Sequence, residues 1–286
     1  MEARALVVGG DGRIARALIP ALARHGYEVV ATTRRRVPDA ARVELDLAEV
    51  ARTGSARLPD CDVAFVCAAM SSYAECRSDE AAARAVNVGA PAAIARALRG
   101  SGAQLVILST NGVFDGEQPF RSAGDTPDGA TAYGRSKAAA EQLVRAIDPD
   151  AAVLRLTRVF RAGEPLLAGW ADRLRAREPV EAFADMVAAP VAVDHAAAAL
   201  VAIARRRAAG ILQLSARREV SYVQIARHIA ARAGAPLELV QAVAAATRGI
   251  GPGEAPRHAS LACEEFLPGF GLAPIEPFDV VDAVLR

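Results

Sequence analysis

The stretch RALVVGGDGRIA, residues 4–15, is an apolar run that ends in a glycine-rich turn and continues as a helical pattern. Gly9 and Gly12 permit a tight turn, and Ala15 permits close packing of the helix on the strand. A pyrophosphate can then approach backbone N–H groups at the helix N-terminus. The stretch predicts a dinucleotide-binding strand–turn–helix unit, although an ordinary glycine-rich turn has the same pattern.

The same alternation of apolar runs and helical stretches continues through the first half of the chain. Further strands are predicted at YEVVATT (27–33), DVAFVCAA (62–69), AQLVILST (103–110) and AAVLRLT (151–157). Strands that are apolar on both faces and alternate with helices are typical of a parallel sheet covered on each side. The predicted fold is α/β, a doubly wound parallel Rossmann sheet with a small C-terminal α/β substrate lobe.

The pattern changes after about residue 160, where short strand candidates lie among helices. One of these helices, SYVQIARHIAARAG (221–234), opens with Ser221 and Gln224 at capping-box spacing. We predict an NAD(P)-binding domain over residues 1–160. A smaller substrate-binding lobe is predicted over residues 161–286, interleaved with the first domain and covering its binding edge.

Composition narrows the class of partner. The 286 residues carry a net charge of +1, which argues against a nucleic-acid or membrane partner attracted by bulk charge. The cysteines lack zinc-site spacing and are expected to be reduced: Cys61, Cys67, Cys76 and Cys263. The histidines are scattered and predict no metal site: His25, His195, His228 and His258. Without a signal peptide or a long apolar run, we expect a soluble, cytoplasmic protein that binds a small molecule, with a homo-oligomer left open.

The end of the second predicted strand bears on the choice of dinucleotide. Arg34, Arg35 and Arg36 stand there, and no carboxylate is present to bind a ribose 2′-hydroxyl. Arginines suit a 2′-phosphate, so the pattern favours NADPH, with NADH possible and a solvated basic turn as the alternative. Asp46 and Leu47, after the third β-type run, are candidates for the adenine side, although Asp46 can also cap the helix that follows.

The segment TAYGRSKAAAE (131–141) contains the only lysine of the chain. Tyr133 and Lys137 are four residues apart and therefore share one face of a helix. A close ammonium favours the phenolate and lowers the pKa of a tyrosine, and its donors can hold ribose hydroxyls. The spacing predicts an acid–base pair, whereas a surface tyrosine packed on a lysine stem is the structural alternative.

The segment STNGVFDG (109–116) lies at the carboxyl end of the predicted strand that precedes this helix. Here the chain resembles the extended short-chain dehydrogenase/reductase superfamily and, more narrowly, the dTDP-4-dehydrorhamnose reductase family. The resemblance spans nearly the whole chain and is carried by these segments: GGDGRIA (9–15), CAAM (67–70), AVNVGAP (85–91), STNGVFDG, TAYGRSKAAAE, LRLTRVF (154–160) and APRHASLACEEF (255–266).

The resemblance implies an NADPH-dependent reductase of a keto group on a nucleotide-activated or modified sugar. It implies that Thr110 hydrogen-bonds the carbonyl, Tyr133 donates a proton and Lys137 tunes the tyrosine and binds ribose. Further residues are implied along the cofactor: Gly9, Gly12, Arg13, Ile14, Ala68 and Ala69. Asn87 is implied to be structural, and the substrate candidates are Met70, Asn111 and Arg158.

Departures from the family pattern lie on the substrate side. Asn111 and Gly112 stand where the family has an acidic and an aromatic residue, and Arg158 stands where an aromatic is usual. The segment DMVAAPV (185–191) also lacks polar family residues. Two alternatives therefore stay open: a non-catalytic subunit resembling the methionine adenosyltransferase regulatory subunit, and a sugar-nucleotide epimerase. A dehydratase is disfavoured, because no Asp–Glu pair follows Thr110.

Overall fold

Seven parallel strands form the central sheet of the computed structural model, which describes residues 3–34, 42–251, 253–263 and 266–286. The order across the sheet is β11-β6-β5-β4-β1-β2-β3. The strands are β1 (Ala3–Val8), β2 (Tyr27–Thr33), β3 (Arg42–Glu44), β4 (Val63–Val66), β5 (Gln104–Thr110), β6 (Ala152–Leu156) and β11 (Gly210–Leu214). The predicted doubly wound parallel sheet is confirmed. Its order reverses at β1, so the crevice beyond the carboxyl ends of β1 and β4 is where such sheets bind ligands.

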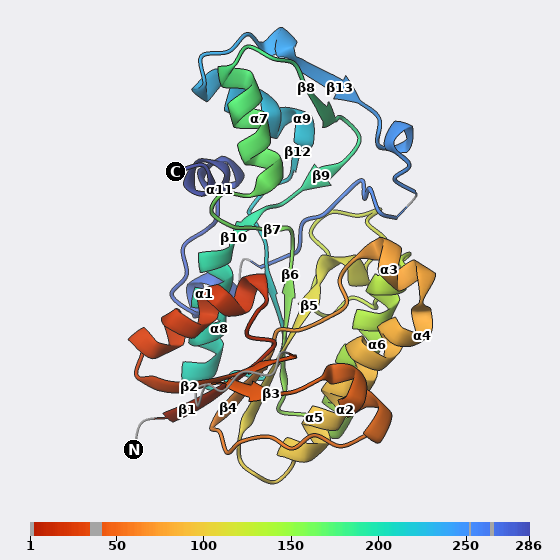
Figure 1. Ribbon diagram of the computed structural model, residues 1–286, viewed down its shortest axis with the longest axis vertical. Coiled ribbons are helices and arrows are strands. Elements are labelled where there is room, and N and C mark those ends of the chain that lie inside the picture. Colours follow the sequence, from red (N-terminus) through yellow and green to blue (C-terminus); the bar gives the residue numbers. More distant parts are fainter. Residues whose placement is uncertain (1–2, 35–41, 252, 264–265) are drawn as a thin grey trace.

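Helices cover both faces of this sheet (Figure 1). On one face lie α1 (Arg13–Arg24) and α8 (Val193–Arg206), and on the other lie α2 (Leu47–Thr53), α5 (Ala90–Leu98) and α6 (Ala132–Ile147). Successive strand residues point to opposite faces. Thus Val7 packs in the core cluster that holds Leu18 of α1, whereas Leu6 packs with Ile94 of α5. Burial on both faces explains why the strands are continuous apolar runs.

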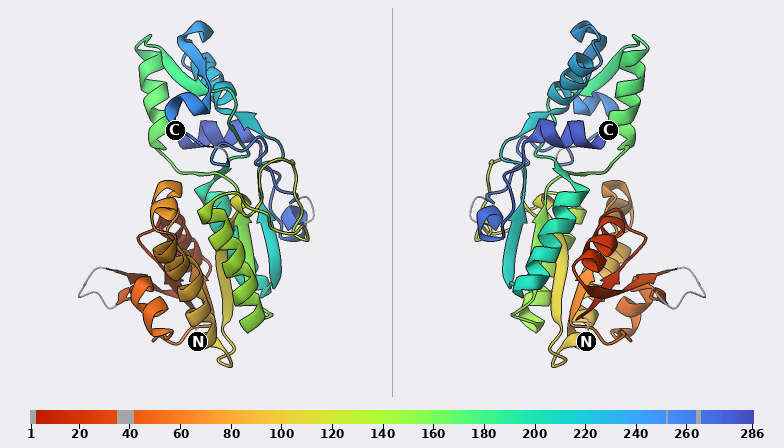
Figure 2. Two further views of the ribbon diagram at one scale, coloured as in Figure 1. Left: turned by 90° about the vertical axis from the view of Figure 1, so that its right-hand side faces the viewer. Right: turned by 90° about the vertical axis from the view of Figure 1, so that its left-hand side faces the viewer.

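A smaller lobe stands above the carboxyl edge of the sheet (Figures 1 and 2). Its elements are α7 (Pro165–Arg175), β8 (Val180–Phe183), β9 (Val187–Ala188), β12 (Val220–Ser221), α9 (Tyr222–Arg232), η3 (Leu237–Leu239), β13 (Val240–Val243), η4 (Ala245–Arg248) and α11 (Pro277–Val284). The capping box predicted for α9 is confirmed: Gln224 N donates to Ser221 Oγ at 3.1 Å, and Ser221 N donates to Gln224 Oε1 at 2.7 Å.

The chain passes repeatedly between sheet and lobe. The two parts are joined by the parallel pair β7 (Val159–Phe160) and β10 (Val191–Ala192). After β10 the chain returns to the sheet as α8 and β11, then enters the lobe again. The division at residue 160 stays a prediction.

The other short elements are α3 (Tyr73–Ser78), α4 (Glu80–Arg84), the π-helix η1 (Ala85–Gly89), η2 (Asn111–Val113) and α10 (Phe266–Gly269). Among the described helices, none combines the length and the apolar character needed to cross a bilayer.

A buried ion pair fastens α6 to the sheet. Glu141 of α6 and Arg155 of β6 are 3% and 1% exposed, and their closest N–O distance is 2.7 Å. Ser109 of β5 also donates to Glu141, and Arg155 Nη1 donates to Gln213 Oε1 of β11 at 3.3 Å. Three neighbouring strands and one helix are therefore held by a single polar cluster. Burying charges of this kind is favourable only when each has its partner.

We expect Glu141→Gln to lower the free energy of unfolding by about 3–5 kcal/mol, because it leaves the Arg155 guanidinium buried without a counter-charge. Chemical denaturation measured by circular dichroism tests this. The matched control is Asp172→Asn, which breaks an Arg175–Asp172 pair whose side chains are 61% and 78% exposed, and it should change stability little. Equal effects of the two substitutions would contradict the interpretation.

Candidate functional site

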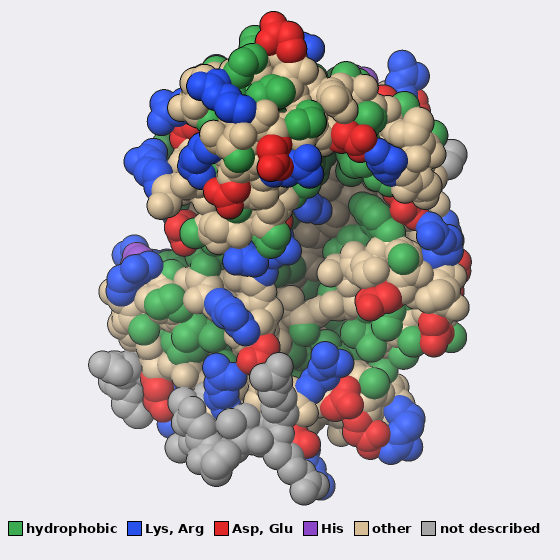
Figure 3. Space-filling model, turned by 45° about the horizontal axis from the view of Figure 1, so that its top comes forward, with side chains coloured by type: hydrophobic (Ala, Val, Ile, Leu, Met, Phe, Trp, Pro, Cys, Tyr) green, Lys and Arg blue, Asp and Glu red, His purple; other side chains and the backbone are tan. Residues whose placement is uncertain are grey.

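A cavity of about 1490 Å³ lies between the carboxyl edge of the sheet and the small lobe. Figure 3 looks toward the hollow between the two parts, which has hydrophobic side chains on its walls. All candidate site residues from the sequence line this one cavity: Gly9, Gly12, Arg13, Ile14, Arg34, Asp46, Leu47, Ala68, Ala69, Met70, Thr110, Asn111, Tyr133, Lys137 and Arg158. Residues separated by up to about half the chain thus share one space because parallel strands end at one edge.

The glycine loop is packed too tightly for side chains. Gly9 has φ +85°, and a Cβ at this position would lie 2.5 Å from the Cβ of Ala68, beyond β4. Gly12 is the N-cap of α1 and offers no side-chain cap, and it lines the cavity together with Arg13 and Ile14 of the first helical turn. Gly9 N donates to Thr32 Oγ1 at 3.0 Å, which ties the loop to β2. This cradle fits a pyrophosphate, whose oxygens accept from backbone N–H groups.

Polar groups at the end of β2 and in the glycine loop make hydrogen bonds and an ion pair with each other and with β3. Asp11 accepts a hydrogen bond from Thr33 Oγ1 at 2.6 Å and pairs with Arg42 at 2.9 Å. Arg34 lines the cavity. The other two arginines of the predicted 2′-phosphate group, Arg35 and Arg36, lie outside the described residues.

Asp46 and Arg13 make contacts within the protein as well as lining the cavity. The Asp46 side chain accepts from Ala48 N at 2.9 Å, so the capping role is confirmed, and its contact with an adenine stays a prediction. Arg13 Nη1 donates to Val159 O at 3.1 Å and pairs with the buried Glu164 at 3.4 Å. Arg13 therefore joins the phosphate loop to the lobe.

Tyr133 and Lys137 project from the first two turns of α6. Thr131 caps this helix by accepting from Gly134 N at 3.0 Å. Lys137 is 5% exposed, and the Tyr133 ring packs edge-on against Tyr73 with centroids 5.8 Å apart. The buried position of the only lysine does not fit a solvent-exposed stem, which was the structural alternative.

Thr110 ends β5 and faces the same cavity. Its Oγ1 accepts from Gly112 N at 3.1 Å, and it points its hydrogen toward Asn111 Oδ1 at a long 3.4 Å. The hydroxyl therefore accepts a good hydrogen bond but donates only this long one. A carbonyl oxygen in the cavity can take the place of Asn111 as its acceptor. Asn111 is held in turn, because its Nδ2 donates to Ala259 O at 3.1 Å.

The pKa values of the pair differ from the predicted direction. The pKa of Tyr133 is raised, chiefly because burial disfavours the phenolate, with further contributions from Tyr73 and Cys76. Burial also lowers the pKa of Lys137 to about 8, against opposing effects of Glu141 and Cys67. The predicted lowering of the Tyr133 pKa is wrong in this structure, because desolvation is the main effect and Lys137 is not among the groups that shift this pKa. The phenol consequently stays protonated at neutral pH.

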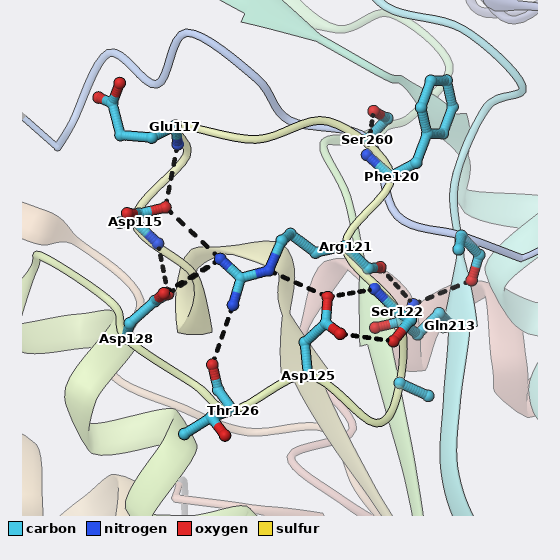
Figure 4. Close-up of polar contacts among 12 residues, drawn as sticks. Asp115, Glu117, Phe120, Arg121, Ser122, Asp125, Thr126, Asp128, Gln213 and Ser260 are labelled. Atoms are coloured by element: carbon cyan, nitrogen blue, oxygen red, sulfur yellow. Dashed lines mark hydrogen bonds and ion pairs between the residues drawn. The ribbon is translucent and has the colours of Figure 1, made fainter.

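The loop that follows the VFDG motif is held by a network of polar contacts (Figure 4). Arg121 is its centre: it pairs with Asp125 at 3.1 Å and with Asp128 at 3.0 Å, and its carbonyl accepts from Gln213 Nε2 at 2.9 Å. The Arg121 guanidinium also lies 4.3 Å from the centroid of the Phe114 ring. Phe114 of the VFDG motif therefore supports this loop through its contact with Arg121.

Sequence reasoning missed several residues around the substrate side of the cavity. Tyr73, Tyr222 and Glu254 line it although they come from three distant segments. Glu219 accepts from the backbone N of Ala259 and of Ser260, both at 2.7 Å, and so fixes the segment that closes one side. No spacing in the sequence marks these residues, because tertiary contacts alone bring them here. Asn87, by contrast, has the structural role that was implied. Its Oδ1 accepts from Met70 N at 2.8 Å, and its Nδ2 donates to Met70 O at 2.9 Å.

Among the described residues, no group of three or more His, Cys, Asp and Glu side chains is arranged to hold a metal ion. The cavity lining includes glycine backbone, hydroxyls, one ammonium, three arginines and several carboxylates. Such a set can bind phosphates and ribose, and it can donate hydrogen bonds and a proton to a carbonyl oxygen.

Comparison with known proteins gives the family. Residues 3–280 match the model described as "RmlD substrate binding domain". The chain belongs to this family. It is 31% identical over 255 residues to a dTDP-4-dehydrorhamnose reductase of Mycobacterium tuberculosis, covering 85% of this chain and 80% of that protein. The predicted family is confirmed, and the named relative is a reductase, as expected for an oxidoreductase.

Solved structures share the fold of this RmlD-family chain. A dTDP-4-dehydrorhamnose reductase from Bacillus anthracis, solved with NADP, superposes with a TM-score of 0.81 at 19% identity, covering 99% of each chain. MoeE5, solved with UDP-glucuronic acid and NAD, has a TM-score of 0.79 at 22% identity and covers 99% of this chain and 97% of its own. At these identities the likeness establishes the fold alone.

The contact between α6 and the Thr110 turn yields a prediction. A Cβ at Gly134 would lie 1.8 Å from Gly112 O, so Gly134→Ala must displace the helix or the turn. We expect a lower thermal unfolding midpoint. The control is Gly169→Ala in α7, where nothing lies within 4 Å and helix propensity favours alanine. A Gly134→Ala midpoint at or above that of the control would contradict the close approach.

The buried ammonium yields a second prediction. The folded-state pKa of Lys137 is about 8 and the ordinary value is 10.5. The folded protein therefore binds fewer protons than the unfolded chain between these values, so the Lys137 contribution to the free energy of unfolding rises with pH across that window. Lys137→Met should lack this rise.

Selective ¹³C-lysine labelling measures that pKa directly, because the chain has a single lysine. The side-chain signal of the folded protein should titrate near the lowered value. The denatured protein is the control and should titrate near 10.5, the ordinary value. Identical titration of the two states would contradict burial of the ammonium.

Proposed function

We propose that the protein is an NADPH-dependent reductase of a keto group on a nucleotide-activated sugar. The observation that carries the proposal is that one cavity joins the glycine cradle to Thr110, Tyr133 and Lys137. Support for a sugar nucleotide comes from the names of the relatives, among them dTDP-4-dehydrorhamnose reductase, and from the UDP-glucuronic acid complex of MoeE5.

The cofactor would lie from the glycine cradle toward Tyr133. The close contact of Gly9 with Ala68 and the N-terminus of α1 at Gly12 fit its pyrophosphate. Arg34 lines the cavity beside β2, where a guanidinium suits a 2′-phosphate, and the Bacillus anthracis relative was solved with NADP. The bound nicotinamide supplies the hydride.

The protein side chains would act on the carbonyl oxygen. Thr110 donates a hydrogen bond to this oxygen, and Tyr133 delivers a proton as negative charge develops there. The raised pKa of Tyr133 keeps the phenol protonated before reaction. Transfer remains downhill, because an alkoxide is a stronger base than a phenolate. Lys137, with a pKa of about 8, is largely charged at neutral pH and stabilises the phenolate that is left.

We expect Tyr133→Phe to lower the rate of NADPH oxidation with a keto-sugar nucleotide by about 10²–10⁴-fold, because the proton donor is lost. Affinity for NADPH, measured by fluorescence titration, should remain close to that of the wild type. Tyr27→Phe is the control, since Tyr27 begins β2 and is absent from the residues that line the cavity. Unchanged turnover in Tyr133→Phe would exclude this tyrosine as the donor.

The same assay separates the two alternatives. Nucleotide released on denaturation is identified, and cofactor oxidation is then followed against a panel of keto-sugar nucleotides. Exchangeable NADPH that is consumed with one ketone supports the reductase. Tightly held NAD with no net consumption indicates an epimerase, and binding without turnover on a broad panel indicates a regulatory subunit.

A further inference from the structure

Arg158 places a positive charge on the substrate side of the cavity. In the sheet, Leu156 of β6 is the register partner of Thr110 of β5. Arg158 follows two residues later and is exposed to the cavity that it lines. Its backbone is fixed, because its carbonyl accepts from Val191 N at 2.9 Å and the preceding Thr157 donates to Ala189 O at 2.5 Å. The side chain therefore starts from a rigid position close to the proposed reacting centre.

Two tyrosines lie within the electrostatic reach of this guanidinium. Burial raises the pKa of Tyr73 and of Tyr222, and the charge of Arg158 opposes that rise at both. The Tyr222 ring packs edge-on against Trp170 and Phe183, at centroid distances of 6.3 and 6.4 Å. Both phenols are protonated at neutral pH and are thus hydrogen-bond donors. Neither hydroxyl has a hydrogen-bond partner within the part of the chain that the structure describes.

The two carboxylates that act on these phenols are already neutralised by other arginines, and Glu75 and Asp79 also line the cavity. Glu254, which acts on Tyr73, pairs with Arg77, and Glu164, which acts on Tyr222, pairs with Arg13. Arg158 itself forms no ion pair with any described residue. Its guanidinium lies 5.7 Å from the centroid of the Phe160 ring. This guanidinium and the two O–H donors line one cavity. A guanidinium and two O–H donors together can bind the oxygens of an anionic group.

We propose that Arg158, Tyr73 and Tyr222 form a subsite for an anionic group of the substrate, either a carboxylate on the sugar ring or the diphosphate of the nucleotide. The inference rests on the proposed function in taking the substrate to be a sugar nucleotide. The Tyr73 ring packs on Tyr133, so this subsite adjoins the proposed proton donor. A carboxylate on the reacting sugar would reach this subsite directly. The diphosphate would reach the subsite if the sugar folds back along the lobe.

Binding of two probes separates these sources. UDP-glucuronic acid and UDP-glucose differ in one carboxylate, and their affinities for the full chain are measured by titration calorimetry with and without NADP⁺. If the subsite takes a ring carboxylate, the wild type binds the uronate about ten- to a hundredfold more tightly, and Arg158→Met removes that preference. If it takes the diphosphate, Arg158→Met weakens both probes by a similar factor.

Two further variants control the interpretation. Arg158→Lys keeps the charge and should retain part of the affinity, whereas Arg161→Met changes an exposed arginine that is not among the cavity-lining residues and should bind as the wild type does. Unchanged affinities in Arg158→Met, or no binding of either probe at millimolar concentration, would overturn the subsite. Because the readout is binding, it stands apart from the NADPH oxidation that tests the reductase, and each proposal can fail alone.

Discussion

The buried Arg155–Glu141 ion pair fastens to the sheet the helix that carries Tyr133 and Lys137. Its two charges come from β6 and α6, and Ser109 and Gln213 extend the contact to the strands on either side. A helix held by apolar contacts alone can slide with little change in area buried, but a paired charge in an apolar interior has one favourable geometry. Thr110 belongs to the same strand as Ser109, so the cluster also fixes the distance across the site.

Desolvation is the second constraint on the site. Enclosure by the sheet edge and the lobe raises the pKa of Tyr133 and lowers that of Lys137, so both groups are biased toward their neutral forms. A proton donor requires the protonated phenol, which burial provides. The lysine near pH 8 retains most of its charge at neutral pH and is correspondingly sensitive to its neighbours, which an arginine with a much higher pKa would not be.

Contacts between sheet and lobe decide what the cavity can recognise. Arg13 links the phosphate loop to Val159 and Glu164, and Glu219 ties down the segment at Ala259 and Ser260. These contacts use up charges that would otherwise face the cavity. The substrate side includes the cationic Arg158 and two phenols, a recognition surface different in character from the glycine cradle at the other end.

The sequence by itself determined the parallel sheet, the glycine loop and the pair on α6, because these depend on local periodicity and on short fixed spacings. The family followed from the resemblance of its motifs to known proteins. It also predicted part of the cavity lining, since strand ends in a doubly wound sheet meet at one edge. Only the tertiary structure decided the direction of the Tyr133 pKa, the partners of Asp11, Arg13 and Glu141, and the presence of Tyr73 and Tyr222 in the site. Those properties arise from burial and from contacts between distant segments, and neither is encoded in the spacing of neighbouring residues.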